Sequence, residues 1–171
     1  MVIQRIAAVA LLTFGVSGIW ASQTGKPAPK ALEAFQHSVA ELQQRPEDQE
    51  LRKKVIQLGQ RLKPAPQIPK EARGHFSRAY SLQREAKSAQ DYESAVEEYQ
   101  KALTLAPWWA AVYYHLGTAY ERLDQYDPAI ANLRFYLASD PGHAGAREAL
   151  DRIQHMEEGK KKVEKKPPTA N

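Results

Sequence analysis

Histidine and acidic side chains are the residues of this chain best suited to metal binding or to acid–base catalysis. The five histidines, at positions 37, 75, 115, 143 and 155, are 12 or more residues apart, whereas paired metal ligands on a helix are typically three to five residues apart. The chain has no cysteine, so a thiol nucleophile and a cysteine-bound zinc ion are excluded. We therefore expect no metal site and interpret the histidines as surface or core-edge residues.

The sequence patterns of common catalytic and nucleotide-binding sites are also missing. There is no Gly-x-Ser-x-Gly elbow, no P-loop and no Gly-x-Gly-x-x-Gly turn. Carboxylates are plentiful, but Glu93, Glu97 and Glu98 have the spacing of a solvated helix face. The sequence predicts neither an enzyme nor a bound cofactor.

The charge distribution argues against nucleic-acid binding. The chain has 24 Lys+Arg against 20 Asp+Glu. Residues 22–75 contain ten basic and six acidic residues, whereas residues 76–155 contain eight and eleven. Because nucleic-acid binding requires basic residues gathered on a folded face, we expect no nucleic-acid partner.

The first 21 residues have the order of a secretory signal. Arg5 precedes 14 uncharged residues at 6–19, and Ala21 follows them. This stretch is shorter than the ~20 apolar residues that a membrane-spanning helix needs. We expect cleavage after Ala21 and an exported protein, periplasmic or secreted. The alternative is an uncleaved segment that tethers the protein to the membrane, facing the periplasm.

The middle of the chain repeats itself with a period of 34 residues, which is typical of a solenoid built from helix pairs. The matching pairs are Tyr92 and Tyr126, Ala95 and Ala129, Leu103 and Leu137, and Pro107 and Pro141.

Residues 110–143 resemble the tetratricopeptide repeat (TPR), a 34-residue helix-turn-helix unit. The residues that carry the resemblance are Tyr113, Leu116, Gly117, Tyr120, Tyr126, Ala129, Leu133 and Pro141. The resemblance implies an all-α fold, an α-solenoid of antiparallel helix pairs wound as a right-handed superhelix and closed by a capping helix. Together with the N-terminal signal, it suggests an exported bacterial TPR protein.

The repeats predict helix boundaries within two units, residues 71–109 and 110–143. In the first unit we expect the first helix to extend through Lys87, with Asp91 as the N-cap of the second. In the second unit we expect Asp127 as N-cap and Pro128 at the first helical position.

The flanking segments are predicted from periodicity and composition. We expect an extended leader at 22–30, a helical hairpin at 31–62 that docks as a degenerate third unit, and a proline-rich connector at 63–70. A capping helix at 144–156 offers Ala146 and Ala149, and Tyr136 is expected to fill the space beside them. The lysine-rich residues 157–171 are predicted to be disordered. One ring of the Trp108-Trp109 pair is expected to pack under the turn between the repeats, with a ligand platform as the alternative.

The first helices of a helix-pair solenoid line its concave side, which can hold an extended peptide or a partner helix. The predicted partner-binding residues lie on the faces of these helices that do not pack in the core. They are Tyr80, Arg84, Tyr114, Thr118, Glu121, Glu148 and Arg152. Ala111 and Lys87 lie on the same faces.

Two functions remain open at the level of sequence. The first is a non-enzymatic scaffold or adaptor that binds a protein or extended peptide in the cell envelope. The second is a structural unit that self-associates as a homodimer through the ends of its short helix stack.

Overall fold

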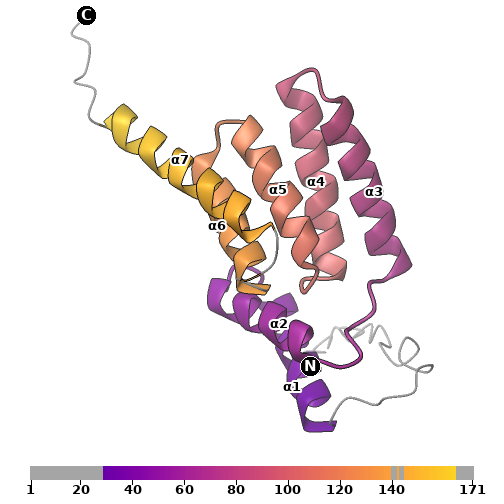
Figure 1. Cartoon of the computed structure of the whole chain (residues 1–171). Coiled ribbons are helices and arrows are strands. Elements are labelled where there is room, and N and C mark those ends of the chain that lie inside the picture. The colour runs from indigo at the N-terminus through magenta and orange to yellow at the C-terminus, as the bar shows by residue number, and fades with distance from the viewer. Residues whose placement is uncertain (1–28, 140–141, 143–144, 165–171) are drawn as a thin grey trace, which may run out of the picture.

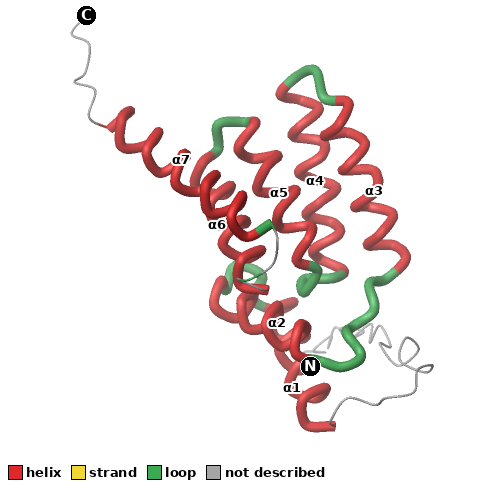
Figure 2. Tube along the Cα trace, viewed as in Figure 1, coloured by secondary structure: helices red, strands yellow, loops and turns green. Residues whose placement is uncertain are grey.

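The computed structural model describes residues 29–139, 142 and 145–164, and this part of the chain contains seven α-helices and no strand (Figures 1 and 2). The all-α solenoid fold predicted from the sequence is confirmed. The predicted signal at 1–21 lies outside the described residues. The helices are α1 (Pro29–Gln44), α2 (Gln49–Arg61), α3 (Lys70–Glu85), α4 (Ala89–Leu105), α5 (Ala110–Arg122), α6 (Tyr126–Ser139) and α7 (Ala146–Glu164).

Helices α3 to α6 stand side by side, α7 continues the row, and α1 and α2 lie across one end of it (Figure 1). Small residues permit this close packing, since Ala79, Ala95, Ala102 and Ala119 are all fully buried. At Gly117 an added Cβ would lie 2.9 Å from Cγ of Leu133 on α6. The side chains recognised in the repeat pattern therefore occupy the helix–helix contacts.

The start of α4 differs from the predicted boundary. Helix α3 ends at Glu85, and Ser88 is the N-cap of α4. Asp91 is the third residue of that helix and completes a capping box, in which its carboxylate accepts from the backbone N–H of Ser88 at 3.0 Å. The prediction of Asp91 as N-cap was wrong because a serine three residues earlier satisfies the same helix end.

The start of α6 also differs. The helix begins at Tyr126, so Asp127 lies inside its first turn and Pro128 is not the first helical residue. The backbone N–H of Ala129 bonds to the carbonyl of Gln125 at 3.1 Å, so the first turn of the helix starts before Asp127. An acidic residue inside the first turn still faces the positive end of the helix dipole.

The N-terminal boundary differs by two residues, because α1 begins at Pro29 rather than after the expected leader at 22–30. Proline is tolerated in the first turn of a helix, because a backbone N–H there would have no acceptor within the helix. Residues 22–28 of that leader lie outside the described residues.

Helix α7 is longer than predicted, since it continues to Glu164 and includes residues 157–164 of the expected disordered tail. Met156 is 1% exposed. Beyond it, Glu157 pairs with Arg134 of α6 at 2.8 Å, and Lys160 pairs with Asp127. The sequence prediction stopped at Met156, where the periodic apolar face ends, but Glu and Lys favour helix and can pair with the preceding helix. Residues 165–171 lie outside the described part.

Tyr136 packs against the cluster of buried residues that joins α6 to α7 and contains Ala149. Its hydroxyl lies 2.5 Å from the place where a Cβ on Gly145 would stand. The large side chain is accommodated by small residues around the start of α7, as the sequence indicated.

The N-terminal hairpin is not a third repeat stacked before α3. Helix α2 packs against α6, and Ile56 belongs to the same buried cluster as Tyr113 of α5. Trp108, in the loop between α4 and α5, packs edge-on against Phe35 of α1 at 5.2 Å. Because the hairpin lacks the small-residue pattern of a repeat, its large apolar side chains pack against this end of the stack instead.

Within the part of the chain that is described, no helix combines the length and the apolar composition that crossing a membrane would require.

Candidate functional site

The predicted partner-binding residues of α5 and α7 are in direct contact. The hydroxyl of Tyr114 donates a hydrogen bond to Oε1 of Glu148 at 2.7 Å. These two residues are 34 positions apart, so they occupy equivalent places in successive repeats. The hydrogen bond from Tyr114 lowers the pKa of the Glu148 carboxyl, with Arg152 acting in the same direction. Partial burial raises the pKa of Tyr114.

Arg152 connects the two acidic residues of the predicted set. Its guanidinium donates to Oε2 of Glu121 at 2.6 Å and to Oε1 of Glu148 at 3.1 Å. Burial acts to lower the pKa of Arg152, but the bonds to Glu121 and Glu148 outweigh it and raise that pKa. Two carboxylates and one guanidinium therefore form a fixed polar network across α5 and α7.

Thr118 links α5 to α3 rather than to α7. Nε2 of Gln83 on α3 donates to Oγ1 of Thr118 at 2.8 Å, and the Thr118 hydroxyl donates to the carbonyl of His115 at 2.8 Å. The other end of the Gln83 amide accepts from the hydroxyl of Tyr99 at 2.7 Å. This amide therefore joins three helices of the stack.

Tyr80 is the most exposed aromatic residue of the predicted set, with 41% of its surface accessible. Its ring stacks on Phe76 at 6.2 Å and meets His115 edge-on at 5.3 Å. Tyr114 continues the row, with its ring 5.4 Å from His115 and 5.0 Å from Tyr136. These five rings form an aromatic cluster that runs from α3 across α5 to α6.

Sequence reasoning missed Phe76, His115 and Tyr136 as members of this cluster. Phe76 lies four residues before Tyr80, so helical spacing could have placed their rings together. No signal in the sequence indicated that His115 would lie among four rings. Burial lowers the pKa of His115 and favours its neutral form.

Arg84 is the predicted residue that the structure leaves apart from the others. It is exposed, and no hydrogen bond or ion pair joins it to another residue of the described part. The other six predicted residues, Tyr80, Tyr114, Thr118, Glu121, Glu148 and Arg152, lie on helices α3, α5 and α7 and are connected through the contacts above. We call this set together with Arg84 the interaction face.

No group of three or more His, Asp or Glu side chains within the described ranges is arranged to hold a metal ion. His75 bonds to Glu98 at 2.9 Å and His115 lies among aromatic rings, so their surroundings are structural. Trp109 packs on Phe76 at 4.8 Å and Trp108 on Phe35. Both indoles are in contact with neighbouring rings, whereas the sequence led us to expect this of one of them.

Comparison with known proteins identifies the repeats. A family model described as TPR repeat matches residues 87–124, and a second, described as tetratricopeptide repeat, matches residues 110–143. A search of curated proteins finds no match to the chain. The two matches together span α4, α5 and α6, which include Ala95, Tyr114 and Gly117. Residues 87–143 are therefore similar to tetratricopeptide repeats, and repeats of this family generally mediate protein–protein interaction.

Proposed function

We propose that the interaction face binds an extended segment of a partner protein. The observation that carries this proposal is the continuous set of contacts from Tyr80 on α3 through Tyr114 on α5 to Glu148 on α7. These are the first helices of successive pairs, and in helix-pair solenoids such helices line the binding surface.

The side chains of this face suit protein recognition. Tyrosine and arginine are enriched among residues that dominate binding energies, because they combine large contact areas with hydrogen-bonding ends. Arg152 is held by two carboxylates, so little side-chain entropy is lost when a partner contacts it. Arg84 is exposed and offers a cation for an acidic side chain of the partner.

The balance of charge indicates how the partner is held. Arg84 and Arg152 are matched by Glu121 and Glu148, so the face has no net charge. Binding should then depend on contact with the exposed ring of Tyr80 and on hydrogen bonds more than on long-range attraction. We expect an affinity that changes little with salt concentration.

We further propose that the protein acts after export, in the periplasm or outside the cell. The support is the sequence of residues 1–21, which has the charge, apolar core and small residue of a secretory signal. Cell fractionation with intact-mass measurement tests this. A soluble envelope fraction that begins at Ser22 is expected, whereas a full-length membrane fraction would indicate a tether and a cytoplasmic fraction would contradict export.

Site-specific crosslinking in intact cells tests the interaction face. A photoreactive phenylalanine replaces Tyr80, and the control is the same replacement at Glu97, an exposed residue on α4. Tyr80 makes no hydrogen bond to another described residue, so the replacement should not disturb the fold. We expect a crosslinked partner from position 80 and none from position 97.

Two results would contradict the proposal. Equal labelling from Tyr80 and Glu97 would remove the distinction between the interaction face and ordinary surface. A product with twice the mass of the chain would mean that a second copy is bound, and would favour the self-associating alternative. Circular dichroism of both variants shows that they retain the helical fold.

A further inference from the structure

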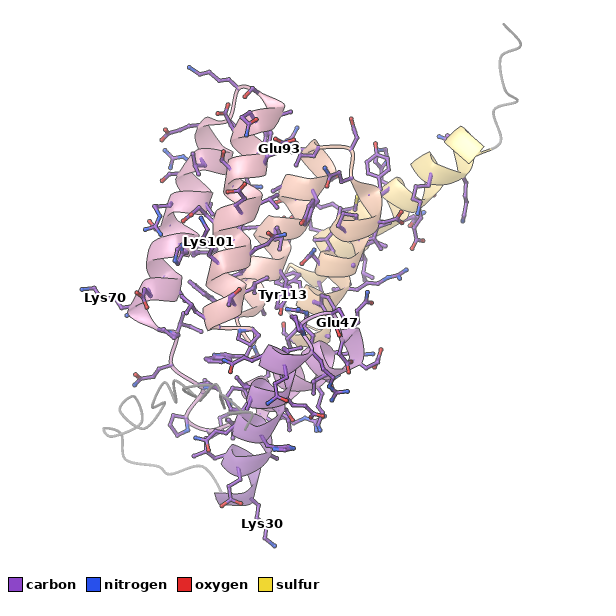
Figure 3. All side chains as sticks on the ribbon, turned by 180° about the vertical axis from the view of Figure 1, so that it is seen from behind. Lys30, Glu47, Lys70, Glu93, Lys101 and Tyr113 are labelled. Carbon is purple, nitrogen blue, oxygen red and sulfur yellow. The ribbon has the colours of Figure 1, made fainter. Side chains whose placement is uncertain are left out.

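A cleft of about 750 Å³ lies between the N-terminal hairpin and the helix stack, away from the interaction face. The hairpin contributes Leu42 and Arg52, and the stack contributes Leu103 of α4, Tyr113 and Leu116 of α5, and Phe135 of α6. Glu47 of the α1–α2 turn and Tyr113, both labelled in Figure 3, line this cleft. The docking of the hairpin against the stack therefore creates a second concave surface.

The cleft has the composition of a binding site. Leu42, Leu103 and Leu116 are buried and give it an apolar floor. Its volume falls in the range of roughly 300–1,000 Å³ that is typical of ligand pockets. The amide side chains of Gln43, Gln49 and Gln100 also line it. Each amide can both donate and accept hydrogen bonds, as the backbone of an extended peptide requires.

Arg52 is a half-buried cation in the wall of this cleft. Its guanidinium carbon lies 5.9 Å from the centroid of the Phe135 ring, and Nη1 donates to the Tyr113 hydroxyl at 3.4 Å. Nη2 donates to the carbonyl of Pro46. These contacts hold the guanidinium in place while leaving other N–H groups available.

No carboxylate of the described residues forms an ion pair with Arg52, whereas Arg152, which is also half-buried, pairs with Glu121 and Glu148. Glu47 also lines the cleft but is exposed at the turn. A cation that is withdrawn from water is usually paired. Arg52 is therefore a half-buried cation that could still pair with a carboxylate brought by a ligand.

We propose that this cleft binds a short extended segment of a partner protein, with an aliphatic side chain on the leucine floor and an Asp or Glu side chain paired with Arg52. The single cation suits one carboxylate and not a phosphate-rich polymer, which needs several basic residues. The amides favour a polypeptide over a small organic acid, because an acid has no backbone for them to bind. This site is separate from the interaction face and does not depend on it.

Two pools of acetylated, amidated hexapeptides test the proposal. Each pool has leucine at the third position, with glutamate or glutamine fixed at the fifth, because alternate residues of an extended chain lie on the same side. The pools are titrated into the full chain, and the methyl signals of Leu103 and Leu116 are followed by NMR. We expect saturable shifts with the glutamate pool and binding about tenfold weaker, or more, with the glutamine pool.

Variants of the protein test whether the peptides bind in the cleft. Arg52→Gln should weaken binding of the glutamate pool about tenfold or more, while Arg61→Gln, an exposed change on the same helix, should not. Thr104→Trp fills the cleft from an exposed position on α4 that is outside the core. It should abolish the shifts and leave the melting temperature unchanged, which separates loss of the site from loss of the fold.

Several outcomes would overturn the proposal. Equal binding of the two pools would exclude pairing with Arg52. Shifts confined to Tyr80 and Thr118 would assign the peptides to the interaction face instead. Sodium acetate that reproduces the leucine shifts at the same concentration would identify a small organic acid as the occupant. No saturable shift with either pool would show that the cleft does not bind such a segment.

Discussion

The helix stack and the N-terminal hairpin are both built from antiparallel helices, but they bury different side chains. Fully buried alanines such as Ala79, Ala95 and Ala129 bring neighbouring helices of the stack together. The hairpin buries large side chains instead, among them Phe35, and its own cluster lacks alanine. Small residues at regular spacing therefore specify which helix is the neighbour, whereas large apolar residues specify only that they must be buried against another surface.

The largest expected effect tests whether the hairpin is part of the stack core. Ile56 on α2 is fully buried in the same cluster as Tyr113 and Leu116 of α5. Ile56→Ala should lower the free energy of unfolding by about 3 kcal/mol, because it removes apolar contacts and leaves a cavity. Urea unfolding followed by circular dichroism measures it, with the exposed change Lys53→Ala as control.

The form of that unfolding curve also matters. If hairpin and stack share one core, Ile56→Ala shifts a single transition to lower urea concentration. A curve in which the hairpin unfolds first, and the stack retains its original midpoint, would show that the two regions are energetically independent.

The next effect compares one close glycine contact of the stack with one of the hairpin. A Cβ at Gly117 would lie 2.9 Å from Cγ of Leu133, and a Cβ at Gly59 would lie 2.9 Å from Cβ of Trp108. Gly117→Ala and Gly59→Ala should each destabilise the protein by about 1–2 kcal/mol, since overpacking outweighs the gain in helix propensity.

Gly74→Ala is the matched control for both glycine variants. Its added Cβ would meet only the flexible end of Arg78, at 3.6 Å. Gly74 lies inside α3, so alanine should stabilise the helix by about 0.5–1 kcal/mol. Thermal unfolding of the three variants gives the comparison. A Gly59→Ala variant that behaves like Gly74→Ala would mean that the hairpin contact can relax, unlike the repeat contact.

The same contrast explains how much of the fold the sequence predicts. Gly117 and Ala129 belong to the pattern that resembles the TPR and meet across the α5–α6 contact, so the stack followed from the 34-residue period together with that resemblance. The hairpin was predicted as two helices, but its docking onto α6 was not. Its position depends on complementary shapes, such as Trp108 against Phe35 and Gly59, which have no sequence period.

For the interaction face, too, the sequence identified individual residues but not all of the contacts between them. Tyr114 and Glu148 were identified from their repeat positions, and the structure joins them. The role of Gln83 was missed, because the sequence does not show that its amide lies between Thr118 and Tyr99. The cleft was missed altogether, since its walls come from segments whose relative placement depends on the docking of the hairpin.

A smaller effect concerns a polar contact inside the stack, where one carboxylate contacts three basic side chains. The carboxylate of Glu98 on α4 accepts from Lys101 at 2.6 Å, His75 at 2.9 Å and Arg78 at 2.8 Å. The bond from Lys101, followed by those from His75 and Arg78, lowers the pKa of Glu98 to about 2. Glu98→Gln should cost about 1 kcal/mol at neutral pH.

The pH dependence of that cost follows from the direction of the shift. The folded-state pKa of Glu98 lies below the ordinary value of 4.5. The stabilisation is therefore fully present above pH 4.5 and is lost as the pH falls towards about 2. Unfolding curves of the wild type and Glu98→Gln at several pH values between these limits should converge as the pH falls. Curves that stay apart by a constant amount would mean that the glutamine acts through packing rather than charge.

The smallest expected effect separates stability from recognition on the interaction face. Tyr114→Phe removes the hydrogen bond to Glu148 but keeps the ring that packs at 5.0 Å on Tyr136. Glu148 is exposed and still accepts from Arg152, so the carboxylate is not left unpaired. The loss should be about 0.5 kcal/mol, at the lower end for a hydrogen bond, because water replaces the missing donor. Thermal unfolding measures it, with the exposed change Glu97→Gln as control. A loss above 2 kcal/mol would mean that this one bond holds α7 on the stack, so that the face is a structural joint rather than a surface that a partner can occupy.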